Sequence, residues 1–156
     1  MPTLELPTVR PRPSRQSHRG DREIFQVEAR VSNQLRHLSQ REGATLFMTL
    51  LAAFKILLYH YTLQADVVVG TPIASRKPAE LEPLIGLFVN TLVLRTDISG
   101  NPSFRERLGR VKNVALMAYT RQDMPFAKLV EEFQRHHETR RHPLFQVFFQ
   151  LQNTPA

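Results

Sequence analysis

The chain has 156 residues, of which 42% are hydrophobic, and a formal net charge of +7 at pH 7. This length can bury the core of one domain, or of one lobe of a larger domain. Because cysteine is absent, disulfide frameworks, thiolate nucleophiles and Cys-based zinc or iron–sulfur sites are excluded.

Charge and hydropathy argue against nucleic-acid and membrane partners. The longest apolar run, 46–61, is interrupted by polar residues and is shorter than the roughly 20 residues that cross a bilayer. It predicts a buried helix. The chain start lacks the pattern of a secretion signal, so we expect a cytoplasmic protein. The positive charge favours an acidic partner, but no recognition helix or set of stacking aromatics typical of nucleic-acid binding is visible.

The first twenty residues contain four prolines and four arginines. Such a composition predicts an extended segment that packs poorly on itself. We interpret 1–20 as an extended lead segment, either a solvated linker or a strap over a surface, and 21–156 as the folded unit. The solvated linker is the favoured alternative.

The first elements of the folded unit follow from periodicity. Alternating apolar residues predict a short strand over 22–28, with Phe25 and Val27 on one face. Apolar residues at helical spacing predict a helix over 31–42 that stops at Gly43. Thr45 is expected to start a second helix, ending near residue 63, whose apolar residues almost encircle its axis. That helix should lie deep in the fold, against a sheet.

A strand over 67–74 is predicted to be buried on both faces. Pro72 cannot donate to a strand ladder, so pairing should change there. A polar loop over 75–78 and one or two helical turns over 79–84 should follow, and Gly86 should act as the hinge into the next strand.

That next strand, 88–95, contains the most unusual feature of the chain. Alternation places Asn90 on the same face as bulky apolar neighbours. A buried amide without partners costs about 1–3 kcal/mol, so Asn90 should either bind a neighbouring backbone or line a polar site. On chemistry alone, a structural amide that braces a loop is the favoured interpretation.

The remaining elements are two helices and a strand. Ser103 and Glu106 form a capping-box pattern at the start of a long amphipathic helix. Pro125 suits the first position of a further helix, and 144–151 alternates like a strand. Helices and strands in this order indicate an α/β arrangement, with helices packed on a mixed sheet of about four strands.

Common catalytic signatures are absent: there is no Gly-rich phosphate loop, no Gly-x-Ser-x-Gly turn and no His-Glu-x-x-His helix. His37 and His60 lie on predicted helices, where surface roles are favoured. His136 and His137 precede a crowd of basic groups, which favours a solvated loop. No metal site is expected.

Several stretches together resemble the C-terminal half of the condensation domain of nonribosomal peptide synthetases. Residues 85–95 resemble the family's fifth core motif, and 121–126 resemble the sixth, usually His-Gln-Asp-Tyr-Pro-Phe-Glu, from which Arg121, Met124 and Ala127 depart. Residues 141–147 resemble the seventh motif, although the residues before its apolar strand differ. Stretches 68–76 and 6–13 are also similar to such domains.

This resemblance implies a fold like that of chloramphenicol acetyltransferase, in which two similar lobes enclose a tunnel, and it implies that the chain is the C-terminal lobe. The family's essential His lies in a His-His-x-x-x-Asp-Gly motif on the other lobe, and this sequence contains no such motif. We therefore expect no catalytic residue in this chain and an N-terminal lobe as its partner.

The resemblance further implies peptide-bond formation between aminoacyl or peptidyl thioesters. The substrates ride on phosphopantetheine arms of donor and acceptor carrier proteins, so no cofactor is expected to bind the chain directly. An adjacent adenylation domain is a further possible partner. The implied residues of the tunnel wall are Asn90, Arg76, Gly86 and Phe88. Those that support the motifs are Arg95, Gln122, Asp123, Pro125, Phe126, Pro143, Phe145 and Gln146. For Arg95, a structural ion pair or a carbonyl contact is favoured over substrate contact.

Alternatives remain open at this point. The chain could be a noncatalytic module that docks carrier proteins, a decayed gene fragment, or, less favoured, an independent acyltransferase with a base among its six histidines. A lobe without its partner exposes an apolar seam, so we expect it to form interfaces.

Overall fold

Capping residues set where two of the helices begin. A computed structural model describes residues 3–9, 20–74, 86, 88–134, 142 and 144–152. The Oγ1 atom of Thr45 accepts a hydrogen bond from the Met48 amide at 3.2 Å, at the start of α2. Ser103 and Glu106 form the expected capping box at the start of α3. The helices are α1 (Ala29–Arg41), α2 (Leu46–Thr62), α3 (Phe104–Thr120) and α4 (Phe126–Gln134).

The helices predicted from periodicity are confirmed. α1 ends two residues before Gly43, which has a φ of +58° and so adopts the left-handed conformation that glycine tolerates best. Pro125 directly precedes α4. The predicted loop at 75–78 and the helical turns at 79–84 lie outside the described residues.

The sheet is mixed. β1 (Asp66–Ala74) and β2 (Val89–Asp97) pair antiparallel in a register that runs from Asp66 opposite Asp97 to Ala74 opposite Val89. Residues 144–151, predicted as a full strand, make one parallel bridge to β1, between Gly70 and Phe148. Of the roughly four strands expected, the described residues therefore form two, plus this bridged segment.

Two strand predictions need correction. The strand over 22–28 is wrong: these residues are extended but unpaired, and they are exposed, Phe25 to 81%. Alternation alone cannot make a strand without a neighbouring edge. The expected change of pairing at Pro72 is also wrong on the β2 side, where the register continues through Pro72 opposite Thr91. Gly70, two residues earlier, bonds away from β2, so the missing donor of Pro72 also faces away from that ladder.

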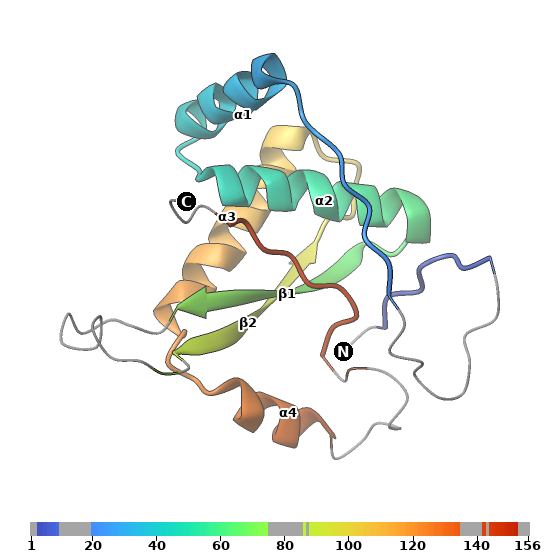
Figure 1. Ribbon diagram of the computed structural model, residues 1–156, viewed down its shortest axis with the longest axis vertical. Helices are drawn as coiled ribbons and strands as arrows, with labels where there is room; N and C mark the ends of the chain where they lie inside the picture. Colours follow the sequence, from blue (N-terminus) through green and yellow to red (C-terminus); the bar gives the residue numbers. More distant parts are fainter. Residues whose placement is uncertain are drawn as a thin grey trace.

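Helices cover both faces of the sheet (Figure 1). α2 and α3 pack on one face, and with them the sheet forms the α2–α3 core. Its buried residues are Leu4, Met48, Leu51, Ala52, Leu58, Val67, Val69, Leu92, Leu94, Ile98, Leu108, Val111 and Ala115. α4 packs on the other face over a smaller α4 cluster, whose buried residues are Val68, Leu144 and Phe145.

The start of the lead segment belongs to the fold. Leu4 is buried in the α2–α3 core, and its amide donates to Gln146 Oε1 at 2.8 Å. Gln64, just after α2, donates to the Thr3 carbonyl and accepts from the Glu5 amide. The favoured interpretation of a solvated linker is therefore wrong for residues 3–6, because a large apolar side chain gains more from burial than from an extended, hydrated state.

Among the described helices, none is by itself long and apolar enough to cross a membrane. α1 and α2 meet that criterion only as a pair, and they are bent by 106° at their junction.

Candidate functional site

Asn90 lies near the start of β2 and braces the turn between α3 and α4. Its Nδ2 atom donates to the carbonyls of Gln122 and Met124, both at 2.8 Å, and its Oδ1 atom accepts from the Phe126 amide at 3.1 Å. One carboxamide thus uses two donors and one acceptor on three backbone groups. The prediction that Asn90 binds a neighbouring backbone is confirmed. Its role in a tunnel wall stays a prediction.

The braced turn also bonds within itself. The Nε2 atom of Gln122 donates to the Tyr119 carbonyl at 2.9 Å, and the Lys128 amide donates to the Pro125 carbonyl. Asp123 and Pro125 are exposed. The residues that match the fifth and sixth motifs are therefore joined, although more than 30 positions separate Asn90 from its partners in the turn.

Phe126 links Asn90 to the α4 cluster, because its amide binds Asn90 and its ring packs against that cluster. Its ring stacks on His142 with centroids 5.7 Å apart, and His142 stacks on Phe145 at 4.4 Å. The Nδ1 atom of His142 accepts the amides of Leu144 and Phe145, both at 3.4 Å. Partial burial lowers the pKa of His142. Through these two acceptor contacts, His142 positions the chain that enters the bridged segment.

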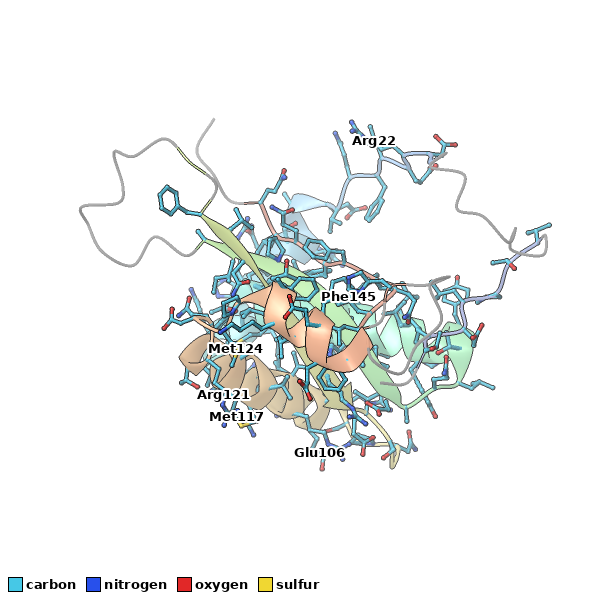
Figure 2. All side chains as sticks on the ribbon, turned by 90° about the horizontal axis from the view of Figure 1, so that it is seen from below. Arg22, Glu106, Met117, Arg121, Met124 and Phe145 are labelled. Carbon is cyan, nitrogen blue, oxygen red and sulfur yellow. The ribbon has the colours of Figure 1, made fainter. Side chains whose placement is uncertain are left out.

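Two residues that match the seventh motif, Phe145 and Gln146, also contact His142. The side chain of Gln146 donates to the His142 carbonyl at 3.1 Å and accepts the Leu4 amide. The Phe145 ring lies against Gly70 in the middle of β1, where an added Cβ would come within 2.4 Å of the ring. Gly70 bonds Val147 and Phe149 through its backbone, at 3.0 and 2.9 Å. Figure 2 shows Phe145 beside α4, on the face of the sheet that this helix covers.

Two further predicted residues, Gly86 and Phe88, lie away from this network in what the structure describes. Gly86 is exposed, and a Cβ added to it would meet the half-buried Phe88 ring at 3.0 Å. Arg76 and Pro143 lie outside the described residues, so their predicted roles stay predictions. The structure therefore joins Asn90 to two of the motif-supporting residues, Gln122 and Phe126. Of the four residues proposed for the tunnel wall it describes Asn90, Gly86 and Phe88.

Arg95 pairs with Asp66 across the two strands. Its Nε atom lies 3.0 Å from both carboxylate oxygens, and its Nη2 atom lies 2.7 Å from Oδ2. The hydrogen bonds and charge of Asp66 raise the pKa of Arg95. The expectation of a structural ion pair is confirmed.

Sequence reasoning missed Lys55, whose side chain is fully buried in α2. Its Nζ atom donates to the carbonyls of Val67 and Leu94, at 3.1 and 2.6 Å, and to Thr96 Oγ1 at 2.8 Å. Burial lowers the pKa of Lys55 to about 7, and the charge of Asp66 opposes that shift. The sequence did contain a signal for it. Lys55 lies within a helix that is apolar on nearly all sides, and a lysine in such a helix has to direct its ammonium group to acceptors in the neighbouring sheet.

Among the described residues, no three histidine, aspartate or glutamate side chains gather as a group that could hold a metal ion. His37 and His60 are exposed on α1 and α2, as predicted, and the His136–His137 pair lies outside the described residues. What the joined residues can do is hold the start of β2, the turn before α4 and the bridged segment in one rigid arrangement.

Comparison with known proteins matches the Condensation domain family over residues 1–156. A linear gramicidin synthase from Brevibacillus parabrevis is 58% identical over 155 residues, which cover 99% of this chain and 3% of that protein. The dimodular nonribosomal peptide synthase of Bacillus subtilis is 46% identical over 152 residues, or 97% and 6% of the two chains. The chain thus spans only a small part of these relatives.

Solved structures also match most of this chain, which again corresponds to only part of each longer chain. The X-domain from teicoplanin biosynthesis superposes with a TM-score of 0.86 and 31% identity, over 94% of this chain and 32% of the other. A four-domain nonribosomal peptide synthetase bound to AMP and glycine gives a TM-score of 0.88 and 28% identity, over 97% and 11% of the two chains.

Proposed function

Because the chain belongs to the condensation-domain family of nonribosomal peptide synthetases, we propose that it supplies one wall of the tunnel in which peptide bonds form. The substrates are aminoacyl or peptidyl thioesters tethered to a donor and an acceptor carrier protein by phosphopantetheine arms. The other wall, with the catalytic histidine, comes from a complementary N-terminal lobe.

The network around Asn90 supports this proposal most directly. It ties together residues that match three separate motifs of the family, from β2 through Gln122 and Phe126 to the bridged segment. A condensation reaction must hold an amine and a thioester carbonyl at near-attack distance, so it needs rigid walls more than additional reactive groups. The role of this lobe is positioning, and proton transfer from the amine falls to the partner's histidine.

The expected surroundings follow from the same proposal. An adjacent adenylation domain would load the acceptor carrier protein, and such machinery operates in the cytoplasm. The phosphopantetheine arm reaches the tunnel as part of the substrate and not as a group resident on this chain.

A peptide-bond assay tests the proposal. Donor and acceptor carrier proteins loaded with aminoacyl groups are incubated with the chain alone, and with the chain plus a separately expressed N-terminal lobe that bears the His-His-x-x-x-Asp-Gly motif. We expect dipeptidyl product only in the mixture. Product from the chain alone would overturn the dependence on a second lobe and return attention to the histidines of this chain.

A matched pair of variants connects that result to the Asn90 network. Asn90→Ala removes the brace of the turn, whereas Asn113→Ala removes an exposed amide from α3. We expect Asn90→Ala to lower the rate in the mixture about tenfold or more, since small displacements in a positioning wall are costly. Asn113→Ala should leave the rate unchanged.

Carrier-protein docking without turnover is the second candidate, favoured by the +7 charge and by exposed arginines on α1 and α3. Carrier binding that falls with added salt, together with no product in either incubation, would favour this candidate.

A further inference from the structure

The outer edge of β2 carries backbone groups that its ladder with β1 does not use. Gly70 bonds away from β2, so Gly70 and its partner Val93 form a pair without mutual hydrogen bonds. By the alternation of an antiparallel ladder, the N–H and C=O groups of Thr91, Val93 and Arg95 all point outward. None of them bonds to another backbone group among the described residues.

This edge forms the floor of a groove between α3 and α4. The groove has a volume of about 740 Å³. On one side stand Val114, Met117 and Ala118 of α3, and on the other stand Pro125 and Leu129. Both walls are therefore apolar where they meet the open edge. A strand that entered the groove would be covered on both faces, as the inner strands of a sheet are.

Two exposed methionines border the groove. Met117 is 54% exposed and Met124 is 50% exposed, and Figure 2 shows both with Arg121 on one side of the molecule, where α3 ends and α4 begins. Methionine side chains are flexible and polarizable, so they adapt to apolar partners of varied shape. Exposed methionines beside unpaired strand groups are typical of a peptide-binding edge.

The charge of the rim indicates what the groove binds. Arg121, Lys128 and Asp123 line it, so cations outnumber the acid, and neither of these two cations forms an ion pair with a described residue. Arg95 is already paired with Asp66. A second copy of the chain is a poor occupant, because edge-to-edge pairing would bring both sets of these cations together and would press α3 and α4 of each copy against the other.

We propose that this groove binds an extended segment of a partner protein, mainly apolar and carrying a carboxylate, which adds as a strand to the outer edge of β2. About five residues match the span from Thr91 to Arg95. Backbone hydrogen bonds to Thr91, Val93 and Arg95 hold the segment, its side chains contact the two helices, and its carboxylate pairs with Arg121 or Lys128. This proposal does not depend on the catalytic role of the lobe.

The test begins with a displayed library of random ten-residue peptides selected on the purified 156-residue chain. Selected peptides should contain runs of β-branched residues with an aspartate or glutamate. Hydrogen exchange of the unmodified chain then locates the binding. Bound peptide should slow the amides of Thr91, Val93 and Arg95 at least tenfold, and should leave the Leu92 and Leu94 amides, already in the ladder, unchanged.

Point variants test whether the peptide binds at the outer edge of β2. Thr91→Pro removes an outward donor without removing a ladder bond, and should weaken the selected peptides at least tenfold. Ala74→Pro removes a backbone donor on the side of β1 that faces away from β2 and should not affect binding. Lys128→Glu should weaken acidic peptides and strengthen versions with lysine in place of the acid.

Three outcomes would overturn the proposal. The first is peptides that bind without slowing those three amides, and the second is selection that enriches no peptide at all. The third is a concentration-dependent dimer, seen by sedimentation, that protects the same amides without peptide, because it would assign the edge to a second copy.

Discussion

The two faces of the sheet are stabilised in different ways. The α2–α3 core buries thirteen hydrophobic residues between two long helices and the sheet, whereas the α4 cluster buries three. The second face relies more on directed contacts, namely the stacking of His142 on Phe145 and the close approach of Phe145 to Gly70. Phe126 and Phe145, from the sixth and seventh motifs, belong to this second face, where they position the turn and the bridged segment more than they add buried area.

The largest effect should come from the core. Lys55→Ala removes a long buried stem and leaves Thr96 without its donor, so we expect the free energy of unfolding to fall by about 3–4 kcal/mol in urea titrations. Lys55→Met fills the same volume and should cost much less, since buried charges are often replaced by apolar residues at little cost. Equal losses in the two variants would show that the ammonium itself is required.

Lys55 should also make the core sensitive to pH. Burial lowers its pKa from 10.5 to about 7. Between these values the unfolded chain holds a proton that the folded chain has released, so stability should rise with pH, by up to about 1.4 kcal/mol per unit. Below pH 7 both states are protonated and this contribution is constant. Urea midpoints measured across the range should lose this slope in Lys55→Met, and a slope that persists would assign it to other groups.

A glycine pair tests the tight packing of the second face. Gly70→Ala would place a Cβ closer to the Phe145 ring than van der Waals contact allows, so we expect a loss of about 2–3 kcal/mol and detachment of the bridged segment. Gly109→Ala, in α3, meets open space and should stabilise by about 0.5–1 kcal/mol. Thermal unfolding of both variants measures these changes. If Gly70→Ala left the unfolding temperature unchanged, the Phe145 ring would have moved aside without cost.

Loss of the Asn90 side chain should loosen the turn before α4 and lower the free energy of unfolding only modestly. Asn90→Ala unpairs three backbone groups that partly regain water, so we expect a loss of about 1–2 kcal/mol. Exchange of the Phe126 amide should accelerate with it, while the Leu94 amide in the core should remain protected. Parallel acceleration at both amides would contradict the separation of the two faces.

The smallest effect is expected at the ion pair. Arg95 and Asp66 are both accessible, with side chains 55% and 36% exposed, so Arg95→Gln should cost less than about 1 kcal/mol. The loss should shrink at high salt, which screens exposed pairs. A larger loss that is independent of salt would mean that the pair contributes through packing.

Helices and the central pair of strands were predictable because each has a local signal: Thr45 and Ser103 cap helices, and alternation marks 88–95. The 22–28 segment has the same alternation and forms no strand, because pairing depends on a neighbouring edge that local sequence does not describe. The structural role of Asn90 was predictable from the cost of an unpaired amide, but its partners at 122–126 were not. Lys55 was missed because hydropathy scores it only as a polar interruption.

The hydrogen bond between the Leu4 amide and Gln146 also bears on the order of events during synthesis. The two residues are 142 positions apart. At about 5–20 residues per second, a ribosome reaches Gln146 roughly 7–28 s after Leu4 has been made. During that interval the helices and β-strands from 29 to 97 can assemble, while Leu4 still lacks this partner. The nascent chain therefore carries Leu4 without this partner for many seconds, and a chaperone that binds short apolar segments has its longest opportunity there.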